Sequence, residues 1–290
     1  MAEVGVRTAR RREARVSSRF WRKVRRNPLD MVPLAVLIFL ILMVALGPFF
    51  YPHDPARADP LNTLQSLSAE HPLGTDELGR DVFARILSGG RVSLAVGLLS
   101  MLVGLSIGTV IGGLAGYFGG KLEAVLMRLV DMFMAIPSFF LILVIVTSFG
   151  NGPAVVIVTV GLAFWAQMAR VVHAEFRKFR ETEFVEASQA LGGSHSRVMI
   201  RHIFPQVLPQ AVVLASLGVG WAILTEAALS YLGLGIQPPL ASWGNMLQNA
   251  QQYLFLKPIL AVWPGVFIGL TVLMFNLLGN ALRDWLDPRN

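Results

Sequence analysis

The sequence predicts an all-α, polytopic membrane protein with six transmembrane helices. Composition is the first reason: 54% of the 290 residues are hydrophobic and 15% are charged, whereas soluble domains carry about 25% charged residues. The second reason is that apolar residues gather into six stretches, five of which are long enough to cross a bilayer. High hydrophobicity excludes intrinsic disorder. The absence of cysteine excludes disulfides, thiolate zinc sites and cysteine nucleophiles.

A transmembrane helix needs about 20 apolar residues, within a range of about 17–25. The stretch at 154–169 is shorter, but Val171 and Val172 follow Arg170 and allow the helix to continue. Because six is an even number, both ends of the chain are expected on one side of the membrane. The predicted spans are 31–50, 92–117, 122–148, 154–169, 206–232 and 259–282.

The distribution of basic residues indicates that both termini are cytoplasmic. Ten Lys/Arg residues fall within the first 26 residues, and six more lie in the loop 170–205. A basic tail can also bind nucleic acid, but the apolar stretch that follows directly favours a cytoplasmic flank. That stretch is longer than the 7–15 or so apolar residues of a cleaved signal peptide. The four arginines of the loop 51–91 are the one departure from the positive-inside pattern.

Three parts of the chain follow from this topology. Residues 1–30 are a basic cytoplasmic tail, 31–91 are the first span and an extracytoplasmic loop, and 92–290 are the transmembrane core with a cytoplasmic loop at 170–205. In the outer loop, Asp76 and Glu77 are expected to open an amphipathic helix that Gly89-Gly90 end. Such a helix either lies in the membrane interface or leads into the second span.

Small residues four apart on the second span predict close helix packing. They are Ser100 followed by Gly104, Gly108, Gly112 and Gly116. Residues four apart share one helix face, and small side chains let a second backbone approach closely in lipid. Pro137 and Pro264-Gly265 are expected to kink the third and sixth spans, either as packing kinks or as points of movement.

Ionisable residues set within spans are functional candidates because they are costly in lipid. Arg128 and Asp131 are three residues apart, so they are expected to pair. Glu226 has no basic neighbour on its own helix and needs a partner elsewhere, a wet cavity or a bound proton. A path-lining role and a helix–helix hydrogen bond both remain open for Glu226. The candidates for a translocation path are Asp131, Pro137 and Glu226.

The loop 170–205 is patterned as a docking element. Phe176, Phe179, Phe184 and Leu191 mark an amphipathic helix that Gly192-Gly193 end, and Ser194 caps a second one. A DNA-binding helix-turn-helix also joins two helices at a Gly turn. The position between two spans favours a cytoplasmic protein partner instead.

Several motifs carry a family resemblance, in order, from about Pro28 to the end of the chain. The motifs are His71-Pro72-Leu73-Gly74-Thr75-Asp76-Glu77-Leu78-Gly79-Arg80-Asp81, Ala115-Gly116-Tyr117-Phe118-Gly119-Gly120, Glu186-Ala187-Ser188-Gln189-Ala190-Leu191-Gly192, Glu226-Ala227-Ala228-Leu229-Ser230-Tyr231-Leu232-Gly233 and Asn276-Leu277-Leu278-Gly279-Asn280-Ala281-Leu282-Arg283-Asp284. With these motifs, the chain resembles the C-type permease subunits of the dipeptide/oligopeptide/nickel ABC importer family. The pattern of the 170–205 loop departs mildly from that of the family, with Ser188, His202 and Phe204 in place of Ala, Ile and Leu.

The resemblance implies a type I ABC importer permease fold in the bacterial inner membrane. It implies a heterodimer with a B-type permease, two ATPase subunits that use ATP and Mg, and an extracytoplasmic peptide-binding protein that docks on the outer loops. The implied solute is a peptide, with nickel chelates or glutathione as alternatives. The implied coupling-helix residues that contact an ATPase are Glu183, Phe184, Val185, Glu186, Ala187, Ser188, Ala190, Leu191, Gly192 and Gly193.

The chain itself is expected to be non-catalytic and to hold no cofactor, metal or nucleic acid. The phosphate-cradling motif is absent, because Gly120-Lys121 is followed by Leu122 and lacks the first glycine. A membrane enzyme would group its reactive side chains, whereas the five histidines are scattered outside the spans. A proton-coupled secondary transporter could use Glu226, but such transporters show internal repeats, and none is visible here.

Overall fold

The computed structural model describes residues 28–286, which form a helical bundle. The described residues contain no β-strand, apart from an isolated bridge between Thr75 and Asp81. The basic tail predicted for 1–30 lies almost entirely outside the described residues. The elements are η1 (Pro28–Met31), α2 (Val32–Phe50), η2 (Pro60–Asn62), α3 (Val82–Phe118), α4 (Gly120–Met134), α5 (Ser138–Phe149), α6 (Pro153–Arg180), α7 (Glu183–Ala190), α8 (His195–Arg197), η3 (Val198–Ile203), α9 (Phe204–Tyr231), α10 (Trp243–Ala250), η4 (Gln251–Tyr253) and α11 (Ile259–Leu286).

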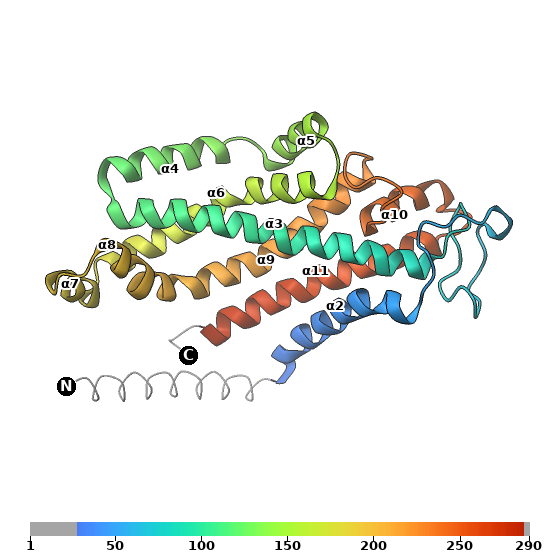
Figure 1. The fold of residues 1–290 in the computed structure, drawn as a ribbon, viewed down its shortest axis with the longest axis horizontal. Helices are drawn as coiled ribbons and strands as arrows, with labels where there is room; N and C mark the ends of the chain where they lie inside the picture. Colours follow the sequence, from blue (N-terminus) through green and yellow to red (C-terminus); the bar gives the residue numbers. More distant parts are fainter. Residues whose placement is uncertain (1–27, 287–290) are drawn as a thin grey trace.

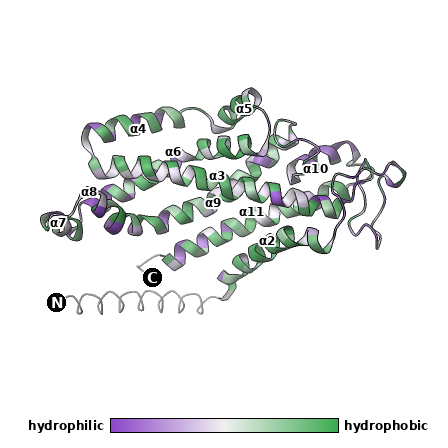
Figure 2. Cartoon of the chain, in the orientation of Figure 1, coloured by the Kyte–Doolittle hydropathy of each residue, from purple (hydrophilic) through white to green (hydrophobic). Residues whose placement is uncertain are grey.

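The long helices lie side by side along one axis (Figure 1). Helix α3 packs against α6 and α9, α2 packs against α3 and α11, and α4 and α5 cover α6. Helices α7 and α8 project at one end, and α10 and the 51–81 loop occupy the other. We call these the α7 end and the α10 end. Hydrophilic residues concentrate at the two ends, and apolar residues dominate the helices between them (Figure 2).

The number of spans agrees with the prediction when the third is counted as a broken helix. Five helices in the described part are long and apolar enough to cross a membrane. The pair α4 and α5 makes a sixth, bent by 82° at the break that contains Pro137. The kink expected at Pro137 is therefore present, whereas Pro264 lies inside an uninterrupted α11. The fourth span continues past Ala169 to Arg180, as Val171 and Val172 allowed.

The helix expected to open at Asp76 and end at Gly89-Gly90 is not formed. Helix α3 starts at Val82, where the Asp81 carboxylate caps it by accepting from the Ala84 amide at 2.6 Å. It then passes through both glycines without a break. These glycines serve close packing instead, because a Cβ on Gly89 would stand 3.1 Å from the Ser242 backbone and one on Gly90 would press on Val44 and Trp243. The segment is therefore the lead-in to the second span.

The glycine stripe of α3 lies against a backbone stripe of α6. A Cβ on Gly104, Gly108, Gly112 or Gly116 would meet the carbonyl oxygens of Gly161, Trp165, Ala169 and His173, in that order. Both series advance by four, so two parallel helices touch along one face for more than three turns. The contact leaves no room for side chains on α3 and fixes α3 and α6 as one unit.

Two helices near the α7 end differ from the predicted pair. The single amphipathic helix expected from Phe176 to Leu191 is divided between α6 and α7, because Thr182 has an extended backbone and its hydroxyl donates to the Phe179 carbonyl oxygen. The second helix is not separate from the fifth span, since His195–Tyr231 is continuous. Its π-helical segment Val198–Ile203 comes directly before the turn that contains Pro205.

Candidate functional site

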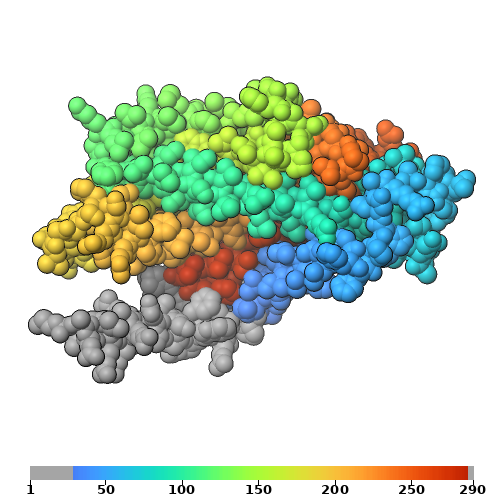
Figure 3. All heavy atoms as spheres, viewed as in Figure 1, coloured from blue at the N-terminus to red at the C-terminus, as the bar shows by residue number. Residues whose placement is uncertain are grey.

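Helix α7 is short and is attached to the bundle by one apolar side chain. Val185 is its buried residue. Gly192 follows with a φ of +78°, a conformation that suits glycine, and reverses the chain towards Ser194. Figure 3 shows this segment as a protrusion at the α7 end.

Most of the predicted coupling residues lie on the outside of this protrusion. Leu191 is 89% exposed and Phe184 is 43% exposed, although both are large and apolar. Large apolar side chains that are exposed together outside the membrane-length helices are typical of a contact surface. The remaining exposed members of the set are Glu183, Glu186, Ala187, Ala190 and Gly192, and the half-buried ones are Ser188 and Gly193.

The α7 segment is also joined to the bundle by polar contacts that sequence reasoning missed. The Tyr117 hydroxyl is hydrogen-bonded to His195 Nδ1 at 2.9 Å, and the Gln189 amide donates to the same hydroxyl at 3.4 Å. Tyr117 lies 78 residues from His195 and 72 from Gln189. No spacing rule links residues this far apart; the nearest signal was the Ser194 cap, which places His195 at a helix start.

The ion pair expected between Arg128 and Asp131 is wrong. Asp131 pairs with Arg170 of α6 across the two packed helices. Both side chains are about half exposed, at 54% and 51%. The partner is therefore chosen by which helix faces α4, not by the spacing along α4.

Pro137 lies at the break between α4 and α5 and lines a cavity of about 230 Å³. The walls of this cavity also include Phe164 and Gln167 of α6 and Trp221 of α9. Gln167 is an exposed polar residue in the largely apolar part of α6 that precedes Arg170. The broken span thus brings a polar amide and aromatic rings together in one hollow.

Glu226 is fully buried among serines. Its carboxyl group accepts from the hydroxyl of Ser93 on α3 at 2.9 Å and from that of Ser230, one turn along α9, at 2.7 Å. Ser93 also accepts from the Trp243 amide at 3.2 Å, which ties α10 to the same cluster. Of the two alternatives left open for Glu226, the described residues show the helix–helix hydrogen bond.

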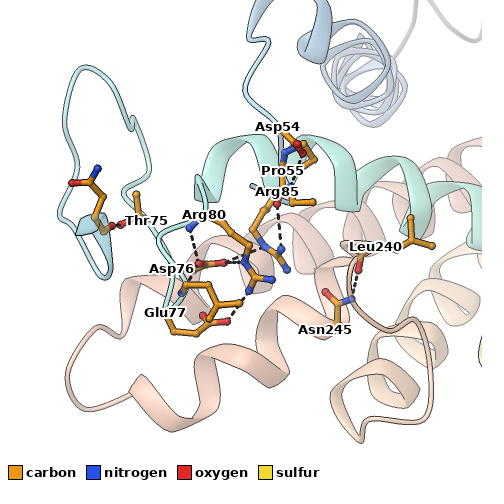
Figure 4. A network of polar contacts seen from close by, with 12 residues as sticks. Asp54, Pro55, Thr75, Asp76, Glu77, Arg80, Arg85, Leu240 and Asn245 are labelled. Atoms are coloured by element: carbon orange, nitrogen blue, oxygen red, sulfur yellow. Dashed lines mark hydrogen bonds and ion pairs between the residues drawn. The ribbon is translucent and has the colours of Figure 1, made fainter. Parts of the chain in front are cut away.

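The 51–81 loop is fixed by a buried ionic network at the α10 end (Figure 4). Asp76 Oδ2 lies 2.7 Å from Arg80 Nε and 3.3 Å from Arg85 Nε, and Arg80 also pairs with Glu77 at 2.7 Å. On α10, Asn245 donates to the Leu240 carbonyl at 2.8 Å and completes a capping box with Ser242. Because Arg85 belongs to α3, these ion pairs connect the loop to the start of that helix.

Asp81 forms a second cluster beside that network. Its Oδ2 accepts from the Tyr51 hydroxyl at 2.9 Å and lies 2.8 Å from His71 Nδ1. Burial, and then the hydrogen bond to the Asp81 carboxylate, raise the pKa of the Tyr51 phenol above its ordinary value. Within residues 28–286, no three His, Asp or Glu side chains are grouped as metal ligands.

Comparison with known proteins identifies the family. Residues 108–290 match the model of the binding-protein-dependent transport system inner membrane component, and residues 17–67 match the N-terminal transmembrane domain of oligopeptide transport permease C. The chain belongs to this family of ABC importer permeases. This agrees with the resemblance derived from the motifs.

Named relatives of the permease act on different solutes. It is 41% identical to the nickel transport system permease protein NikC of Escherichia coli K12, over 87% of this chain and 92% of the relative. It is 39% identical to the glutathione transport system permease protein GsiD of Pectobacterium atrosepticum, over 93% and 90%. It is 37% identical to the dipeptide transport system permease protein DppC of Bacillus subtilis, over 93% and 84%.

A solved structure shares the fold of the permease. The inward-facing methionine ABC transporter MetNI superposes with a TM-score of 0.57 at 20% identity, covering 69% of this chain and 95% of the other. The ABC importer permease fold expected from the motifs is thereby confirmed.

Proposed function

We propose that this permease forms half of the pathway of an ATP-driven peptide importer in the bacterial inner membrane, with α7 as its coupling helix. The observation that carries the proposal is the exposure of Leu191 and Phe184 on a short helix outside the bundle. Two ATPase subunits, using ATP and Mg, would receive this helix in a cleft. A B-type permease would complete the pathway, and an extracytoplasmic binding protein would deliver the solute to the α10 end. The chain itself would supply no catalytic group and hold no cofactor.

The charge pattern supports the orientation, with the α7 end and both termini in the cytoplasm. The loop 170–205 carries six Lys/Arg residues, and the segment 233–257 carries one. Met31, the last residue of η1, packs against Ala281 and Trp285 of α11, so the two ends of the described chain lie together.

The three candidate path residues would lie at different positions relative to the solute. Pro137 and the hollow beside it would face the solute, with Gln167 and Trp221 as neighbours. Asp131 would lie nearer the α7 end, paired with Arg170. Glu226 is enclosed by its own chain in this conformation, so it would reach the path only if α10 moved away from α3 and α9.

Capture of the ATPase subunits tests the coupling helix. The full permease is co-expressed with its partner permease and tagged ATPase subunits, and the amount captured is compared between wild type, Leu191→Asp and the matched control Phe255→Asp. Phe255 is fully exposed at the opposite end of the molecule. We expect Leu191→Asp to lose capture and Phe255→Asp to retain it. Equal capture by all three proteins would contradict the proposal.

The solute is tested by uptake into proteoliposomes that hold the complete complex. We expect ATP-dependent uptake of a labelled dipeptide that excess unlabelled dipeptide abolishes and that glutathione or a nickel chelate leaves unchanged. Uptake blocked by glutathione or by the nickel chelate would instead support the alternatives suggested by the relatives. Uptake by the permease alone, driven by a proton gradient, would favour a secondary transporter.

A further inference from the structure

We propose that Tyr117 is the positioning residue that passes the displacement of α7 to α3. This inference rests on the proposed role of α7 as the coupling helix. Tyr117 is the last residue but one of α3 and is 5% exposed. Its hydroxyl meets His195, at the start of the helix that continues into α9, and Gln189 on α7. The hydroxyl of one buried residue therefore joins the end of α3 to two neighbouring segments that lie more than 70 residues further along the chain.

The surroundings of Tyr117 hold it in place from other directions. The rings of Tyr117 and His195 meet edge to face with centroids 5.7 Å apart, and Phe118 lies 5.8 Å from the same imidazole. Arg180, the last residue of α6, donates to the Tyr117 carbonyl oxygen at 3.3 Å. The end of α3 is thus attached to α6, α7 and the helix start at His195.

The attachment of α7 makes this contact sensitive to small movements. Val185 is the buried residue of α7, so apolar packing fixes its position only weakly. A hydrogen bond weakens steeply beyond about 3.5 Å. The Gln189 contact is already at 3.4 Å, whereas the His195 contact is at 2.9 Å. The His195 contact would therefore survive a shift of α7 by about 1 Å and pass it to Tyr117, because only residues 191–194 separate α7 from His195.

Helix α3 is long and tightly packed, so a shift at its Tyr117 end would also displace its end beside the 51–81 loop. Its 37 residues span about 55 Å, and the glycine stripe packs it rigidly on α6. At its far end, Asp81 caps the helix and also binds Tyr51 and His71 of the outer loop. A single rigid helix therefore ends at α7 on one side and at the 51–81 loop on the other.

The test measures solute transported per ATP hydrolysed by the complete complex in proteoliposomes. Tyr117→Phe keeps the ring and removes the hydroxyl, and His195→Leu removes the partner. His195→Asn keeps a polar atom close to the position of Nδ1. We expect the first two variants to lower the ratio by about 2- to 10-fold, the range set by one hydrogen bond, and His195→Asn to stay near wild type. The matched control is Tyr231→Phe at the α10 end of α9, where no change is expected.

Two outcomes would overturn the inference. One is a wild-type ratio in both Tyr117→Phe and His195→Leu at equal ATPase capture; the other is a proportional fall of transport and hydrolysis that leaves the ratio unchanged. If Tyr117→Phe fails to assemble, the comparison of His195→Leu with His195→Asn still tests the inference, because His195 is exposed and its substitution leaves the core intact. Failure of the proposed function appears separately, as unchanged ATPase capture in Leu191→Asp.

Discussion

The two ends of the bundle differ in how deeply their charged side chains are buried. At the α10 end, Asp76, Arg80 and Arg85 are between 2% and 6% exposed and pair with one another. Towards the α7 end, the pair between Asp131 and Arg170 is about half exposed, and the pair between Arg180 and Glu181 is 30% and 68% exposed. One end uses its charges to fix its own loop, whereas the other leaves charged and apolar groups accessible.

The difference in burial follows from the secondary structure at each end. The 51–81 loop between α2 and α3 has 31 residues and little regular structure, so buried ionic and hydrogen-bonded groups replace helix packing there. The α7 segment has its own helix and is attached to the bundle by few contacts, mainly the buried Val185 and the hydrogen bond from Gln189 to Tyr117. An element held by few contacts can move or be bound by another protein.

Removal of Asp76 is expected to give the largest effect. Asp76→Ala leaves the buried guanidinium of Arg85 without its ion-pair partner, and breaking a buried pair costs about 3–5 kcal/mol. The measurement is the free energy of unfolding in detergent micelles. Glu70→Ala, an exposed acid of the same loop, is the control and is expected within about 0.5 kcal/mol of wild type. If Asp76→Ala lowered the free energy of unfolding by less than about 1 kcal/mol, the buried network would be no stronger than an exposed ion pair, and the contrast between the two ends would be lost.

Truncation of Glu226 is expected to come second. Glu226→Ala leaves the hydroxyls of Ser93 and Ser230 without their acceptor and opens a cavity, which together cost about 2–3 kcal/mol. Glu226→Gln keeps the shape and the acceptor, so we expect a loss of about 1 kcal/mol or less. The same unfolding measurement separates the two variants. Equal losses in Ala and Gln would show that hydrogen bonding is not the basis of this cluster.

The smallest effect is expected for Asp131 near the α7 end. Asp131→Ala removes a half-exposed pair, and such pairs contribute about 0–1 kcal/mol. A double-mutant cycle with Arg170→Ala isolates the pair from other effects. A coupling energy above about 2 kcal/mol would mean that this pair is as important as the buried network, and the contrast between the ends would be lost.

Particular residues show how far sequence reasoning reaches. The lengths of the apolar stretches predicted the long helices, and Pro137 predicted the break between α4 and α5. Gly192 marked the reversal after α7 because it takes a positive φ. The partners that Asp131, Glu226 and Tyr117 find on other helices were out of reach, since they are separated from them by 39 to 133 residues along the chain.

By itself, the sequence determined that this is a helical membrane permease of the ABC importer family. Hydrophobic length, charge bias and ordered motifs are local properties, and local properties can be read along one chain. Only the tertiary structure decided which helix Arg170 faces, that Gly89-Gly90 are packing sites instead of a helix end, and that Tyr117 joins α3 to the α7 segment. Those features depend on which surfaces meet when distant helices pack, and no periodicity along the chain encodes that choice.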